Sequence, residues 1–178
     1  MTSGGAIMRK VRLFIATSLD GHIARADGRI DWLFHDADYG YAAFYDSIDT
    51  VVMGRRTYDE VLGLGPYPYP DKAGYVFSHS RPARIAKHVE FVSGPPGKLV
   101  ARLRETAGKD IWLAGGAGLA AAFLDDDLVD EIIVSVHPVV LGSGIPLFPR
   151  QGREVALTLR GVQSFASGLV QLRYDRRR

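Results

Sequence analysis

The sequence predicts an α/β domain with a mixed, mostly parallel central sheet, helices on both of its faces, and antiparallel strands at its C-terminal end. Up to residue 128, short apolar runs alternate with helix-like segments, as in proteins built around a parallel sheet. After that point apolar runs follow one another with no helical pattern between them, which is typical of antiparallel strands. With 178 residues, 47% of them hydrophobic, the chain is long enough to bury one core, and we expect a single domain.

The composition excludes several classes of protein. The chain has no cysteine, which rules out disulfides, thiolate catalysis and cysteine-bound zinc and is compatible with a cytoplasmic location. No apolar run approaches the roughly 18 residues of a membrane span, and no basic stripe with interleaved aromatics suggests nucleic acid as a partner. His22 and His137 stand alone without a ligand pattern, so we expect no metal. We expect residues 1–8 to form a disordered leader, residues 9–175 the domain, and residues 176–178 a solvated basic tail.

Apolar periodicity and turn residues predict the individual elements. The expected strands are residues 11–18, 49–54, 74–78, 88–93, 110–114, 129–140, 154–165 and 169–173. The expected helices are residues 55–62, 97–107 and 119–124, preceded by a first helix that Asp36 caps at its N-terminus. The prolines of residues 63–71 exclude a helix or central strand there, and Tyr67 and Tyr69 in that segment suit a lid, a subunit contact or a cover for the core edge.

A strand, three glycines and a helix follow one another within residues 110–128. The N–H groups that begin a helix have no internal partner, and the helix dipole adds positive potential, so a phosphate can bind at such a junction. A glycine-rich turn without a ligand is the alternative. Gly116, Gly118 and Ala121 match the spacing of a dinucleotide-binding fingerprint, but residues 132–137 lack the acid that would hold the ribose. We therefore predict a dinucleotide phosphate at a helix N-terminus and no Rossmann fold.

A second strand, glycine and helix junction occurs at Gly54. Arg55 and Arg56 follow it directly, and their planar guanidinium groups match the geometry of a phosphate, although adjacent arginines are also common on protein surfaces. A third strand is followed by residues 78–81, Ser-His-Ser-Arg, which suit either a further phosphate group or an ordinary polar loop. Two such junctions could hold two parts of one dinucleotide.

Five segments in order resemble the dihydrofolate reductase fold family, and within it the reductase domain of the bacterial bifunctional riboflavin-biosynthesis deaminase-reductase and its stand-alone relatives. They are SLDGHIA (18–24), DWL (31–33), VVMGRRTYDEV (51–61), WLAGGAGL (112–119) and HPVVLGSGIPLF (137–148), and they extend over residues 11 to about 174. The resemblance implies a three-layer fold and an NADPH-dependent oxidoreductase of the 5-amino-6-(5-phosphoribosylamino)uracil reductase type, working as a homodimer. The deaminase signature, with its cysteines, does not occur in this sequence.

The resemblance also implies which residues bind NADPH. Phosphates would be held by Gly54, Arg55, Arg56 and Thr57, with Arg55 or Arg56 near the 2′-phosphate. The adenosine end would contact Ser78, His79 and Arg81. The pyrophosphate would lie on Gly115, Gly116, Ala117, Gly118 and Leu119, and the nicotinamide on Ala16, Thr17 and Ile23.

Reduction of a C=N bond needs a proton as well as a hydride. By position in the family, Asp38 would supply that proton, with Asp36 as the alternative. A substrate phosphate would be held by Arg25, Arg29 or Lys72. Dihydrofolate reductase activity is a second hypothesis for the function, although Tyr41 and Phe44 depart from the dihydrofolate reductase pattern around the acid. A nucleotide-binding protein with no physiological hydride acceptor is a third.

Overall fold

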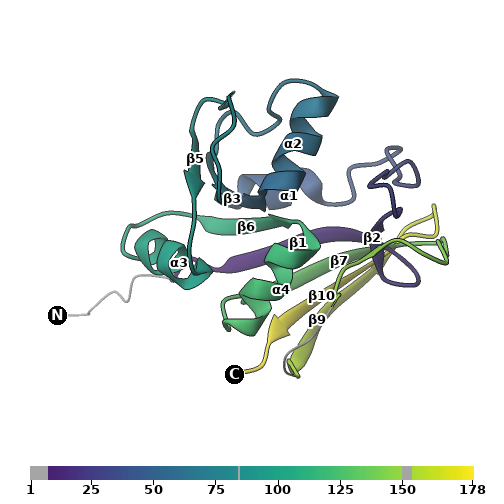
Figure 1. The fold of residues 1–178 in the computed structure, drawn as a ribbon. Helices are drawn as coiled ribbons and strands as arrows, with labels where there is room; N and C mark the ends of the chain where they lie inside the picture. The colour runs from purple at the N-terminus through teal and green to yellow at the C-terminus, as the bar shows by residue number, and fades with distance from the viewer. Residues whose placement is uncertain (1–7, 84, 150–153) are drawn as a thin grey trace.

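A computed structural model describes residues 8–83, 85–149 and 154–178 of the chain (Figure 1). Four helices occur in that portion: α1 (Tyr41–Asp46), α2 (Arg55–Leu64), α3 (Pro96–Arg104) and α4 (Ala117–Asp125). The strands are β1 (Val11–Ser18), β2 (His22–Ala24), β3 (Ile48–Gly54), β4 (Ala73–Phe77), β5 (Val89–Val92), β6 (Asp110–Gly115), β7 (Glu131–His137), β8 (Ile145–Pro146), β9 (Leu157–Ser164) and β10 (Val170–Arg176). The same portion contains no helix long and apolar enough to cross a bilayer.

Eight of the strands form one mixed sheet in the order β5-β4-β3-β6-β1-β7-β10-β9. Every pairing from β5 to β7 is parallel, whereas β10 runs antiparallel to both β7 and β9. This confirms the predicted mixed, mostly parallel sheet with antiparallel C-terminal strands. Because the carboxyl ends of parallel strands meet at one edge, the chain segments that leave β1, β3 and β6 come together there.

The helices cover both faces of the sheet, which gives the expected three layers (Figure 1). Side chains alternate along each strand, so neighbouring residues of β3 enter different cores. Val52 packs in a core with residues of α3 and α4, such as Leu99 and Phe123. Val51 and Met53 pack on the other face in a core that includes Phe44 of α1 and Tyr58 of α2. One strand therefore anchors both layers of helices next to the edge where β3 ends.

The first helix starts later than the sequence predicted. The expected N-cap at Asp36 is wrong, because α1 begins at Tyr41 after Gly40. Tyr39 and Gly40 have φ values of 53° and 78°, a left-handed backbone that cannot continue into a right-handed helix. Asp38 lies closer to the helix start, and its carboxylate accepts a hydrogen bond of 3.0 Å from the N–H of Ala42. α4 begins at Ala117, two residues before its predicted start.

The chain ends also differ from the prediction. The prediction of a solvated tail is wrong for Arg176. This residue is the last of β10 and forms an ion pair with Asp127. Arg178 donates a hydrogen bond of 2.6 Å to Asp130. The acidic residues after α4 therefore draw this basic segment onto the domain. The predicted leader falls outside the described residues except for Met8, whose side chain is exposed.

Candidate functional site

A cleft of about 610 Å³ opens at the carboxyl edge of the parallel strands. Its lining comes from β1, β2, β6 and β8, from the end of β3, from the start and one face of α2, from the start of α4, and from the loops around residues 28–33 and 69. The lining residues are Phe14, Ile15, Ala16, Ile23, Ala24, Gly28, Ile30, Leu33, Gly54, Arg55, Arg56, Thr57, Glu60, Val61, Leu64, Tyr69, Trp112, Ala114, Gly115, Gly116, Ala117, Gly118, Leu119 and Ile145.

The two strand, glycine and helix junctions lie side by side in the lining of this cleft, because β3 pairs with β6. A Cβ atom built on Gly54 would lie 3.7 Å from the backbone nitrogen of Gly116, and one built on Gly116 would lie 3.3 Å from the hydroxyl of Thr57. The peptide bond between Gly115 and Gly116 is cis. Neither α2 nor α4 has a side chain that caps its first turn. The N–H groups that begin both helices are therefore available to one anionic ligand.

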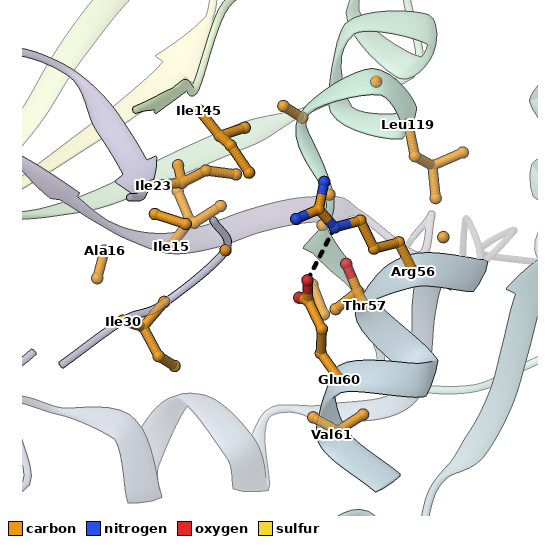
Figure 2. Close-up of a pocket in the computed structure, with 18 of the residues that line it drawn as sticks. Ile15, Ala16, Ile23, Ile30, Arg56, Thr57, Glu60, Val61, Leu119 and Ile145 are labelled. Carbon is orange, nitrogen blue, oxygen red and sulfur yellow. Dashed lines mark hydrogen bonds and ion pairs between the residues drawn. The ribbon is translucent and has the colours of Figure 1, made fainter. Parts of the chain in front are cut away.

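Arg55 and Arg56 supply full positive charge beside these helix starts, and each has a carboxylate four residues further along α2. Arg55 Nε lies 2.8 Å from Asp59 Oδ2, and its Nη1 lies 3.4 Å from Ser80 Oγ. Arg56 Nε donates to Glu60 Oε1 at 2.9 Å, as the dashed line in Figure 2 marks. Exposed pairs of this kind contribute about 0.3–0.5 kcal/mol, so a phosphate can replace either carboxylate at little cost.

Residues 78–81 lie beside the cleft but outside its lining. Ser80 connects this loop to the cleft, because its backbone oxygen and its hydroxyl oxygen each lie 3.4 Å from Nη1 of Arg55. Ser78 donates a hydrogen bond of 2.7 Å to the oxygen of Ser80 and so holds the loop in shape. His79 and Arg81 are exposed. The structure thus brings the loop to the outer side of Arg55, where a ligand that extended past that arginine would meet it.

The side of the cleft opposite α2 is apolar. Ile15, Ile23 and Ile145 gather there, facing Arg56 and Glu60 across the space (Figure 2). Of the three residues expected at the nicotinamide, Ala16 and Ile23 line the cleft, whereas Thr17 is buried and does not. The sequence analysis did not identify Ile145, which β8 brings to the cleft by pairing with β2. No local pattern predicts that pairing, because the two strands lie more than 100 residues apart.

Three aromatic residues also line the cleft; the sequence analysis did not identify Phe14 or Trp112, and it expected Tyr69 only as part of a lid, a subunit contact or a cover for the core edge. Phe14 lies on β1, Trp112 on β6, and Tyr69 in the proline-rich segment before β4. Phe14 was accessible to sequence reasoning, since it is two residues from Ala16 on the same strand and so faces the same way. Tyr69 was not, because an irregular segment gives no periodicity from which to read a direction.

The two predicted proton donors lie outside the lining of the cleft. Asp36 accepts a hydrogen bond of 2.7 Å from the hydroxyl of Tyr39, and Asp38 accepts one from the start of α1. The carboxylate that does line the cleft is Glu60, which the sequence reading missed although it stands four residues after Arg56 on one helix face. A role for Asp36 or Asp38 as proton donor stays a prediction.

The cations proposed for a substrate phosphate already have carboxylate partners. Arg25 pairs with Asp31 at 2.6 Å and Arg29 with Asp27 at 2.7 Å, both on the surface. Lys72 is buried, with its amine 3.2 Å from Asp71 and 4.2 Å from the ring centre of Tyr45. None of the three lines the cleft.

His22 and His137 have separate environments. His22 Nδ1 lies 3.3 Å from Asp20 Oδ2. The buried ring of His137 accepts the N–H of Phe34 at Nε2 and so donates from Nδ1 to the oxygen of Ser135, both at 3.2 Å. Burial lowers the pKa of His137. Within residues 8–83, 85–149 and 154–178, no group of three or more potential ligands is arranged to hold a metal ion.

Comparison with known proteins identifies relatives along nearly the whole chain. A family model described as the RibD C-terminal domain matches residues 9–171. The uncharacterized protein YwjB of Bacillus subtilis is 47% identical over 172 residues, which cover 94% of this chain and 98% of that protein. A Shewanella sp. PV-4 protein, provisionally assigned to riboflavin biosynthesis, superposes with a TM-score of 0.85 at 30% identity, covering 95% of this chain and 99% of its own.

Two more distant structures show the same fold. The Thermotoga maritima diaminohydroxyphosphoribosylaminopyrimidine deaminase/5-amino-6-(5-phosphoribosylamino)uracil reductase gives a TM-score of 0.75 at 18% identity, and the match covers 96% of this chain and 57% of that one. Dihydrofolate reductase from Enterococcus faecalis, complexed with NADP(H), gives 0.64 at 17% identity over 95% and 97% of the two chains. At these identities the likeness concerns the fold, and it confirms the resemblance to the dihydrofolate reductase fold family.

Proposed function

The chain belongs to the RibD C-terminal domain family, and from this premise we propose that it is an NADPH-dependent reductase of a small heterocyclic or ribosyl substrate. One observation carries the proposal: two uncapped helix starts and two arginines converge on a single cleft at the carboxyl edge of the sheet. Helix starts and guanidinium groups both bind phosphate, and a dinucleotide presents phosphates at two separated points.

Each part of the cleft has a role in this proposal. The starts of α2 and α4, with Thr57, would hold the pyrophosphate, and Arg55 would reach the 2′-phosphate beside Ser80. Ala16, Ile23 and Ile145 would pack around the nicotinamide and exclude water from it. The bound cofactor would supply the hydride, and the protein would supply position and a dry environment. We propose that water supplies the accompanying proton, since Asp36 and Asp38 lie outside the lining.

Nucleotide titration tests the cofactor assignment. We expect NADPH to bind more tightly than NADH when nucleotide fluorescence is followed during titration of the purified protein. The double variant Arg55→Ala, Arg56→Ala should weaken NADPH binding by about tenfold or more, because a hydrogen bond to a charged group contributes about 1.5–3 kcal/mol. The matched control is Arg102→Ala, Arg160→Ala, which removes two exposed arginines that pair with Glu90 and Asp175 away from the cleft.

The outcomes separate the candidate functions. Tight NADPH binding that the double variant loses and the control keeps supports the cofactor site, and oxidation of NADPH by a candidate substrate then supports an enzyme. Binding without oxidation of NADPH by any pyrimidine or pterin substrate would favour a nucleotide-binding protein. If neither nucleotide binds, the cofactor assignment is wrong.

We also propose that the protein is a homodimer, as its family resemblance implies. β9 is an edge strand of the sheet and exposes Leu159 and Val162. A bulge in β9 sets Leu159 opposite Tyr174 and Val162 opposite Leu172, so both side chains point to the same face. Light scattering on the purified protein should give twice the chain mass, and Leu159→Glu, Val162→Glu should give a monomer. A monomeric wild type would refute this part of the proposal.

A further inference from the structure

An aromatic wall formed by Phe14, Tyr69 and Trp112 lines part of the cleft, and Phe14 and Trp112 each stand two residues before a small lining residue, Ala16 or Ala114, on the same strand. The ring centres of Tyr69 and Trp112 lie 5.1 Å apart, and those of Phe14 and Trp112 lie 6.4 Å apart. The three residues come from β1, β6 and the segment before β4. Residues from three separate parts of the chain therefore surround one apolar space beside the proposed nicotinamide subsite.

We propose that the aromatic wall is the substrate subsite and that the substrate presents a flat, uncharged ring system to it, without a phosphate group. The proposal deepens the proposed function, on which it relies for the neighbouring hydride donor. The ring subsite itself is defined by side chains that bind no part of the cofactor in that proposal.

The polarity of the wall favours a ring over a chain of hydroxyls. The indole N–H of Trp112 already donates to the backbone oxygen of Phe14 at 3.1 Å, so it offers no free donor. Ile30, Leu33 and Val61 add aliphatic side chains to the lining of the same cleft. A sugar chain buried against the wall would leave its hydroxyl groups without partners, whereas an aromatic ring gains apolar contact there.

Tyr69 adds one polar group to the subsite. Its hydroxyl makes no hydrogen bond within the described part of the chain, and burial raises its pKa. The hydroxyl therefore stays protonated and can donate a hydrogen bond to a ring carbonyl or ring nitrogen. This gives Tyr69 two roles: its ring contacts the substrate ring, and its hydroxyl fixes the orientation of that ring.

The charges near the cleft favour a substrate without phosphate. Arg25, Arg29 and Lys72 lie outside the lining of the cleft. The arginines that line the cleft, Arg55 and Arg56, are at the start of α2, where the proposal assigns them to the cofactor. Among the described lining residues, the wall itself carries no cation, and a buried phosphate without one is costly.

Calorimetric titration tests the ring subsite with lumazine as a flat, uncharged probe. We expect Tyr69→Ala to weaken lumazine binding by about tenfold, since an aromatic contact contributes about two- to tenfold beyond area burial and the lost ring area adds to that factor. NADPH binding should stay within about twofold of the wild type. The matched control is Tyr75→Ala, which removes a partly buried tyrosine that packs against Arg102 and does not line the cleft.

A second pair of variants tests the hydroxyl. Tyr69→Phe keeps the ring and removes the donor, and Tyr67→Phe makes the same change two residues away, where the ring packs on Tyr58 outside the cleft. We expect weaker lumazine binding in Tyr69→Phe alone. Because these variants retain their rings, they remain informative if Tyr69→Ala fails to fold.

A further calorimetric titration tests the role of phosphate by comparing the binding of 5-amino-6-(5-phosphoribosylamino)uracil with that of its dephosphorylated riboside. We expect the riboside to bind at least as tightly. The proposal is overturned if the phosphorylated compound binds tenfold more tightly, or if lumazine binding is indifferent to both changes at Tyr69. If the protein binds no NADPH but its lumazine binding depends on Tyr69, the proposed function is refuted and the ring subsite is supported.

Discussion

The carboxylate of Asp20 accepts a hydrogen bond of 2.8 Å from the backbone N–H of Gly142, which lies 122 residues further along the chain. Its other oxygen accepts the hydroxyl of Ser18 at 2.6 Å and the N–H of Leu141 at 3.1 Å. These donors, Ser18 first, lower the pKa of Asp20. The contact fixes the turn between β1 and β2 against the loop before β8, and so sets the two strands that carry Ile23 and Ile145 side by side.

Removal of this carboxylate should disturb the side of the cleft that we propose for the nicotinamide. We expect Asp20→Ala to lower turnover with NADPH by about tenfold or more, because small displacements of positioning groups are costly in rate. Asp27→Ala, which removes an exposed carboxylate from the neighbouring turn, is the control and should have little effect. The folded-state pKa of Asp20 lies below the unfolded value of about 4. Its contribution to the unfolding free energy is therefore complete above that pH and is lost as the pH falls toward the folded-state pKa. Equal turnover in the two variants would contradict a positioning role.

Two glycines of the same loop should respond differently to alanine. Gly142 and Gly144 both have positive φ, at 75° and 153°. A Cβ atom at Gly142 meets nothing within 4 Å, whereas one at Gly144 would overlap the carbonyl oxygen of Ala24 on β2. Gly142→Ala should cost about 1 kcal/mol of unfolding free energy from backbone strain, and Gly144→Ala about 3 kcal/mol. Urea unfolding measures both, and similar losses would show that the close approach of Gly144 to β2 is unimportant.

The buried ring of His137 should make stability depend on pH. Its neutral form is required because Nε2 accepts the N–H of Phe34, and burial lowers its pKa below the unfolded value of about 6.5. As the pH falls below that value, the unfolded chain takes up a proton that the folded chain does not. The unfolding free energy should therefore fall, with a slope from this residue of at most about 1.4 kcal/mol per pH unit.

Urea unfolding at pH 7.5 and 5.5 checks this dependence. His137→Gln should flatten it, since an amide does not titrate. His88→Gln removes an exposed histidine and should leave the dependence as it is in the wild type. An unchanged dependence in His137→Gln would assign it to another group.

Asp38→Asn separates capping from proton donation. The side-chain oxygen of asparagine can still accept the N–H of Ala42, so the start of α1 should be preserved. Because Asp38 lies outside the lining of the cleft, we expect turnover within about twofold of the wild type across pH 6–8. A loss of about a hundredfold or more in a folded variant would instead identify Asp38 as the proton donor, as the family resemblance implied.

Local sequence determined the strand, glycine and helix junctions of this protein and the order of its strands and helices. A glycine between an apolar run and a helical pattern identifies a junction wherever the strand lies, because the conformation of the turn and the free N–H groups are properties of a few consecutive residues. Gly54 and Gly116 were predicted in this way, and both line the cleft. The alternation of apolar runs with helices was equally local, and the parallel order of β3, β4 and β6 agrees with it.

The tertiary structure alone decided which distant residues meet. The pairing of β2 with β8 brings Ile145 to the cleft, and the path of the proline-rich segment brings Tyr69 against Trp112. Asp38 was placed near the acid position by its distance from Gly54 along the chain. The left-handed backbone at Tyr39 and Gly40 instead delays the helix, and Asp38 stands before the helix and accepts the N–H of Ala42 in its first turn. Sequence spacing sets direction only within a regular element. In irregular segments, long-range packing decides where a side chain points, and a single sequence contains no local signal of that packing.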